Sequence, residues 1–159
     1  MSWAALIVCL GVCFGVAGLG AWWTAPEIVG WYTTLKRPSF APPSWVFGPI
    51  WTLLYALMAV AAWLIWLSSL SEARNFALGL FVGQLALNLA WSWIFFRQHS
   101  LVGALIDIVL LWLAVGETTI AFGQIAPRAA LLMAPYWAWV TFAMALNLAF
   151  VRLNPGAND

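Results

Sequence analysis

The chain has 159 residues, of which 65% are hydrophobic and only 7% are charged, and its formal net charge is +1. Soluble domains carry about 25% charged residues, so this composition excludes a soluble protein and predicts a single-domain protein embedded in a lipid bilayer. The near-zero net charge also excludes the basic surface that nucleic-acid binding requires.

Five apolar stretches are long enough to cross the hydrocarbon layer as helices. They are expected at residues 3–23, 45–67, 75–96, 101–122 and 129–151. Short polar turns separate the later stretches, so neighbouring helices should run antiparallel. The sequence therefore predicts an all-α membrane protein, a bundle of five transmembrane helices. Helical spans favour the inner over the outer bacterial membrane, with the outer membrane left open as an alternative.

The basic residues predict the orientation of this bundle. The connector after the first span, the turn after the third and the C-terminal tail should share one side of the membrane. That side carries four basic residues and the other side carries two. The four are Lys36, Arg37, Arg97 and Arg152, and the two are Arg74 and Arg128. Cytoplasmic loops are enriched in Lys and Arg, so the N-terminus is expected on the outside.

Residues 25–44 form a connector that differs from the rest of the chain. This connector and the start of the second span hold four of the eight prolines, Pro38, Pro42, Pro43 and Pro49. Proline removes a backbone donor and clashes with the preceding helical turn, so Arg37 to Pro43 is expected to be a stiff, non-helical part of a structured lid. An N-cap at Ser44 would leave Pro49 in the first turns of the second helix.

The third span has a face of small residues, Gly79, Gly83, Ala86 and Ala90. Small residues at four-residue spacing allow two helices to approach closely in lipid. This face predicts a homodimer interface, and packing within one bundle is the alternative. A separate face carries Gln84, Asn88 and Trp91, whose polar groups need partners on other helices or on a ligand.

Two acidic residues, Asp107 and Glu117, lie in the fourth span. They point roughly 80° apart on an ideal helix, so they do not form a catalytic carboxylate pair. A hydrogen bond from Asp107 to a neighbouring helix is expected, and a proton relay is the alternative. The sole histidine, His99, lies in a turn, so no metal site and no haem ligation by histidine is expected, and no cofactor is required.

Aromatic residues of three spans are able to line one cavity, with Trp51 and Tyr55 from the second, Trp91 from the third and Trp139 from the fifth. Trp51 and Tyr55 share a helix face with Phe47. Such a cavity would suit a flat apolar ligand, and simple aromatic packing is the alternative.

Three motifs resemble the TspO/MBR family, the translocator proteins and bacterial tryptophan-rich sensory proteins. The connector motif is W-Y-x-x-L-x-(K/R)-P-S-(W/F)-x-P-P-x-W-V-F-x-P-x-W-T-x-x-Y and begins at Trp31. The others are Gln84-x-x-x-Asn88-x-x-Trp91-x-x-x-Phe95-Phe96 and Pro135-Tyr136-x-x-Trp139-x-x-Phe142-Ala143-x-x-Leu146-Asn147. Two positions depart from the pattern. Phe40 replaces a frequent tryptophan, and Leu148 replaces the aromatic residue of a sterol-recognition pattern.

The resemblance implies a five-helix, commonly dimeric membrane protein that binds porphyrins such as protoporphyrin IX beneath the connector. Its role would be tetrapyrrole sensing, transport or scavenging. The implied ligand contacts are Tyr32, Pro42, Trp51, Tyr55, Asn88, Trp91, Trp139 and Ala143. One alternative is an enzyme that degrades porphyrin with light and oxygen, for which Trp51 and Trp139 would be the catalytic candidates. Another is a transporter of a different amphipathic ligand, such as a sterol or lipid.

Overall fold

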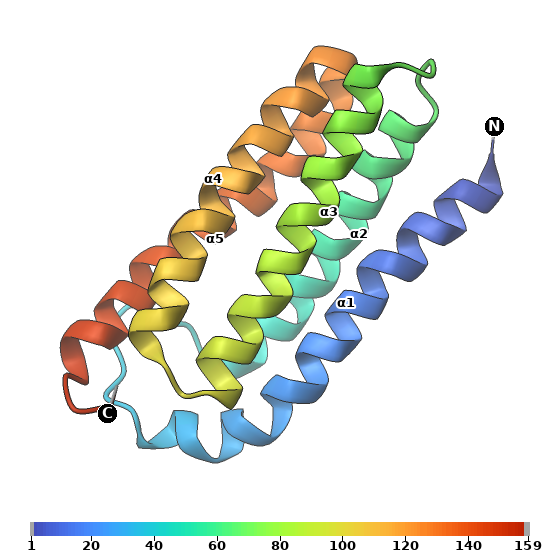
Figure 1. Ribbon diagram of the computed structural model, residues 1–159. Coiled ribbons are helices and arrows are strands. Elements are labelled where there is room, and N and C mark those ends of the chain that lie inside the picture. The colour runs from blue at the N-terminus through green and yellow to red at the C-terminus, as the bar shows by residue number, and fades with distance from the viewer. Residues whose placement is uncertain (1, 158–159) are drawn as a thin grey trace.

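Five long helices lie side by side in the computed structural model, which describes residues 2–157 (Figure 1). They are α1 (Trp3–Val29), α2 (Phe47–Trp66), α3 (Glu72–Ser92), α4 (Leu101–Ile125) and α5 (Pro127–Leu153). Each belongs to a segment that is long and apolar enough to cross a membrane, and no strand occurs between residues 2 and 157. The predicted bundle of five transmembrane helices is confirmed.

The helices form a ring in which neighbours in space are not always neighbours in the chain. α1 packs against α2 and α3, α2 also packs against α5, and α4 packs between α5 and α3. The connector, the turn between α3 and α4 and the C-terminal end lie together at one end of the ring, and the N-terminal end lies at the other (Figure 1). The side of the membrane that each end faces stays a prediction.

Several helices extend beyond the apolar stretches from which they were predicted. α1 continues through Pro26 to Val29 although this proline removes one helical hydrogen bond, and at its end the Gly30 N–H bonds to the Glu27 carbonyl. α3 begins before its apolar stretch, because the Ser71 hydroxyl accepts a hydrogen bond of 3.2 Å from the backbone N–H of Arg74. A capping side chain rather than hydropathy therefore sets the start of α3.

The connector between α1 and α2 is non-helical over most of its length, as its prolines predict. It contains two short 3₁₀ turns, η1 (Trp31–Thr34) and η2 (Ser44–Val46). The Asn154 side chain fixes the stretch between them, because it accepts a hydrogen bond of 2.8 Å from Lys36 N and donates one of 3.0 Å to Lys36 O. The C-terminal end of α5 thus holds the connector in place.

The expected N-cap at Ser44 is wrong. Ser44 is the first residue of η2, its side chain makes no capping hydrogen bond, and η2 leads directly into α2. Pro49 is nevertheless tolerated, because it is the third residue of α2. The first four N–H groups of a helix have no partner within that helix, so its missing N–H removes no bond there.

The contact between α4 and α5 is closest at Gly116. A methyl group at this position would lie 2.7 Å from Cζ2 of Trp137 on α5. By contrast, a methyl group at Gly11 on α1 would meet no other atom within 4 Å. Glycine at position 116 is therefore what allows the two helices to pack with an indole between them.

We predict that Gly116→Ala lowers the thermal unfolding midpoint of the detergent-solubilised protein. Overpacking a close contact costs about 1–3 kcal/mol, which outweighs the higher helix propensity of alanine, worth about 1 kcal/mol. Gly11→Ala is the matched control and should leave the midpoint unchanged or raise it. Equal midpoints for the two variants would show that Trp137 moves aside without cost.

Candidate functional site

A cavity of about 480 Å³ lies between α1, α2, α3 and α5 at the connector end of the bundle. No charged side chain is among the described residues that line it. The lining residues are Phe14, Ala17, Gly18, Gly20, Ala21, Thr24, Ala25, Ile28, Tyr32, Ser44, Phe47, Gly48, Trp51, Thr52, Tyr55, Asn88, Trp91, Ser92, Phe95, Phe96, Trp139, Ala143, Leu146, Asn147 and Phe150. An apolar enclosure with a few polar groups is typical of a small-molecule site.

Aromatic rings of α2 and α5 form one wall. The Trp51 and Trp139 ring centroids are 6.4 Å apart with the planes at 87°, and Phe47 meets Trp139 at 5.9 Å and 72°. Tyr55 lies next to Trp51 at 5.7 Å. The face predicted for α2 from the spacing of its aromatic residues therefore meets α5, and both indoles border the cavity.

A second wall comes from the end of α3, where the helix widens into a π-helical turn, η3 (Trp93–Arg97). Within this turn Phe95 and Phe96 are both buried although they are adjacent in sequence. Trp91 stacks on Phe95 at 5.0 Å, and Tyr32 from the connector contacts both phenylalanine rings. The widened turn thus places two consecutive aromatic side chains against the cavity and the lid.

A buried amide connects three helices beside the cavity. Asn88 Oδ1 accepts a hydrogen bond of 2.7 Å from the Tyr55 hydroxyl, and Asn88 Nδ2 donates one of 2.8 Å to the Tyr136 hydroxyl. One turn further along α3, Trp91 Nε1 donates to Asn147 Oδ1 at 3.1 Å. The amide face predicted on α3 therefore makes helix-to-helix hydrogen bonds, and Asn88 also lies on the cavity wall.

One polar group on the cavity wall lacks a partner. Trp139 Nε1 is buried and has no acceptor among the described residues. A buried N–H without an acceptor costs free energy.

The structure brings seven of the eight predicted contact residues to this one cavity. They are Tyr32, Trp51, Tyr55, Asn88, Trp91, Trp139 and Ala143. Pro42 is the exception, because it lies in the connector, where its carbonyl accepts a hydrogen bond of 2.8 Å from Arg37. Binding by these residues stays a prediction.

The part of the cavity wall that α1 provides was not predicted from the sequence. This wall is formed largely by small residues at four-residue spacing, Ala17, Ala21 and Ala25. The spacing was visible in the sequence, but small residues on one helix do not show which space they leave open. The cavity exists because these small side chains face the bulky aromatic residues of α2 and α5.

The predicted dimer face lies outside the cavity. Gly79, Gly83 and Ala86 are exposed on the outer surface of α3, and Ala90 is half-buried. A methyl group at Gly79 or Gly83 would meet no other atom within 4 Å. The close packing that these residues allow is therefore not used within this bundle at the two glycines.

The acidic residues of α4 do not take part in the site. Asp107 is buried, and its Oδ2 has no hydrogen-bond partner among the described residues, so the expected hydrogen bond to a neighbouring helix is not seen at this oxygen. Glu117 is exposed. Neither residue lines the cavity.

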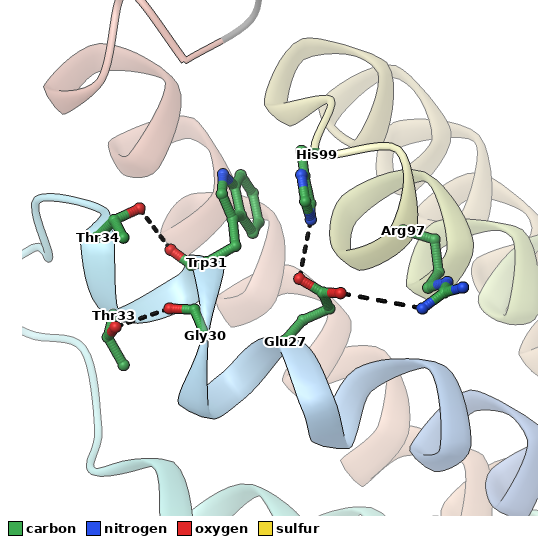
Figure 2. A network of polar contacts seen from close by, with 7 residues as sticks. All are labelled: Glu27, Gly30, Trp31, Thr33, Thr34, Arg97 and His99. Carbon is green, nitrogen blue, oxygen red and sulfur yellow. Dashed lines mark hydrogen bonds and ion pairs between the residues drawn. The ribbon is translucent and has the colours of Figure 1, made fainter.

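A polar contact closes the connector end of the site. Figure 2 shows the Glu27 carboxylate between two basic groups, with Oε2 at 2.9 Å from His99 Nε2 and Oε1 at 3.9 Å from Arg97 Nη1. The Trp31 ring stacks on the His99 ring at 4.2 Å and 13°. The end of α1 and the start of the lid are thus attached to the turn between α3 and α4. Sequence reasoning gave no signal for this contact, because the partners are far apart in the chain.

Residues 6–153 match the TspO/MBR family. The chain is 40% identical over 151 residues to the tryptophan-rich protein TspO of Chlorobaculum tepidum, a match that covers 94% of this chain and 96% of that protein. It is 43% identical over 132 residues to the translocator protein of Homo sapiens, covering 82% and 78%. It is 37% identical over 154 residues to the tryptophan-rich sensory protein of Cereibacter sphaeroides, covering 97% and 94%.

We predict that Asn88→Ala lowers the free energy of unfolding by about 1–3 kcal/mol, because the variant leaves the buried hydroxyls of Tyr55 and Tyr136 without this partner. Thr52→Ala is the control, because Thr52 lines the same cavity but bonds only to the Gly48 carbonyl of its own helix. Denaturation in detergent monitored by circular dichroism measures both. A loss no larger for Asn88→Ala than for Thr52→Ala would argue against a stabilising role for the amide.

Proposed function

Because the chain belongs to the TspO/MBR family, we propose that this multi-pass membrane protein binds porphyrins such as protoporphyrin IX in the cavity beneath the connector. The observation that carries this proposal is the cavity itself. It is uncharged, its volume of about 480 Å³ lies in the usual range for small-molecule sites, and Trp51, Trp91 and Trp139 line it. A flat aromatic ligand gains stacking and edge contacts from such walls.

The names of the relatives support a role of this protein in sensing or transporting its ligand. One relative is called a tryptophan-rich sensory protein and another a translocator protein. Binding is the step that both roles share, and it is therefore the property to test first.

Titration of the purified protein with protoporphyrin IX in the dark tests this proposal. Protoporphyrin should quench the tryptophan fluorescence, because the indoles of Trp51 and Trp139 lie against the cavity. Trp51→Phe and Trp139→Phe should each weaken binding by less than about tenfold, since a phenyl ring still stacks and one aromatic contact is worth about 0.5–1.5 kcal/mol.

Trp22→Phe is the matched control for this experiment, because Trp22 is 73% exposed and does not line the cavity. It should leave the affinity unchanged. Unchanged affinity in both cavity variants would place the binding site elsewhere.

Light-dependent degradation of the porphyrin is a second candidate activity. The observation that favours it is the pair of indoles, Trp51 and Trp139, whose centroids lie 6.4 Å apart on the cavity wall. Indole is readily oxidised, so these residues are placed to react with a photoexcited ligand. Under illumination in air, the two variants should lose far more degradation than binding if the indoles take part, and equal losses would mean that they only hold the ligand.

We further propose that the protein forms a homodimer through the exposed small-residue face of α3. Gly83→Leu should shift the detergent-solubilised protein toward the monomer in light-scattering measurements, because a bulky side chain prevents close helix approach. Gly15→Leu is the control, since Gly15 also faces open space but lies on α1. A dimer that persists in Gly83→Leu would place the interface on another helix.

A further inference from the structure

The described lining of the cavity has no charge of its own, yet a cation contacts one of its lining residues. The Arg37 guanidinium lies over the Tyr32 ring with its carbon 5.5 Å from the ring centroid. Tyr32 is a lining residue. Burial raises the pKa of the Tyr32 hydroxyl, and the neighbouring Arg37 guanidinium opposes that rise. Arg37 itself is exposed and does not line the cavity, so the Tyr32 ring is its contact with the cavity wall.

The charge of Arg37 is not balanced by an acid within the described part of the chain. The two ion pairs between described residues both use Glu27, which pairs with Arg97 and His99. The contacts of Arg37 are instead neutral, the Tyr32 ring and the Pro42 carbonyl. An anionic group of a ligand would therefore not have to displace a carboxylate from this guanidinium.

Arg37 is held in position for such a group. Its Nη2 donates a hydrogen bond of 2.8 Å to Pro42 O, and the connector that carries it is fixed to Asn154 through the backbone of Lys36. A guanidinium has five N–H donors, so the bond to Pro42 leaves donors for a carboxylate. Its planar fork matches a carboxylate with two parallel hydrogen bonds.

We propose that Arg37 is the anion-recognition residue of this site, and that the site selects amphipathic ligands with an apolar body and a carboxylate at one end. This inference rests on the proposed function, because the apolar body is the part that the cavity holds. The carboxylate-bearing side chains of a porphyrin fit this description. Lys36 is not assigned the role, because among the described residues only its backbone has a partner, Asn154, whereas Arg37 contacts a residue of the cavity wall.

The test compares protoporphyrin IX with its dimethyl ester, which has the same ring but no charge. The full chain in nanodiscs of neutral phosphatidylcholine is titrated with each compound in the dark at neutral pH, and empty nanodiscs correct for partition into lipid. The unaltered protein should bind the acid roughly tenfold more tightly than the ester, as expected for a hydrogen bond to a charged group. Arg37→Gln should remove this difference by weakening the acid alone.

Two further variants test whether the guanidinium of Arg37 itself recognises the carboxylate. Lys36→Gln loses the same charge one residue away and should keep the full difference between acid and ester. Arg37→Lys should keep only part of it, because an ammonium group holds the charge without the planar fork.

Three results would overturn the inference alone. These are equal binding of acid and ester by the unaltered protein, an Arg37→Gln variant that weakens both compounds equally, and loss of the difference in Lys36→Gln. The second result would mean that Arg37 only holds the connector, and the third that the difference depends on the total positive charge of the connector rather than on the Arg37 guanidinium. Failure of the unaltered protein to bind either compound would overturn the proposed function as well.

Discussion

Hydrocarbon offers no hydrogen-bond partner, so each polar group that lies within the membrane must find one in the protein. The backbone meets this requirement by forming helices. Several buried polar side chains meet it by a hydrogen bond to another side chain or to a backbone carbonyl. Thr118 and Thr119 donate to carbonyls one turn back in their own helix, and Asn88 is shared by two tyrosines from neighbouring helices. The two hydrogen bonds of Asn88 fix which faces of α2, α3 and α5 meet.

The cavity follows from the way those faces meet. Asn88 holds Tyr55 of α2 and Tyr136 of α5 at fixed distances from α3, while bulky indoles prevent the helices from closing further at the connector end. Against them α1 presents small side chains. The cavity thus arises where large and small side chains line the same space, beside a network of hydrogen bonds that sets the spacing.

Much of this arrangement was predictable from the sequence, because hydropathy and helical spacing are local properties. The five spans, the non-helical connector and the shared face of Trp51 and Tyr55 follow from such local patterns. The π-helical turn and the contact of Glu27 with His99 do not, because they depend on which distant segments meet. The cap at Ser44 failed for a related reason, since a 3₁₀ turn took the place of the capping side chain.

Among the described residues, the hydrogen bonds and ring contacts that join α1 to other helices lie near its two ends, and apolar packing holds its middle. At one end Trp63 of α2 donates a hydrogen bond to the Ser2 carbonyl and stacks with Trp3, and at the other end Glu27 contacts the turn after α3. Between these ends Cys13 is the one buried residue that α1 contributes to the described core, and methyl groups at Gly11, Gly15 and Gly18 would meet open space. A helix that is held by specific contacts at its two ends bends most easily between them. Apolar packing has no preferred direction, so we expect the cavity wall formed by α1 to yield more easily than its two end contacts.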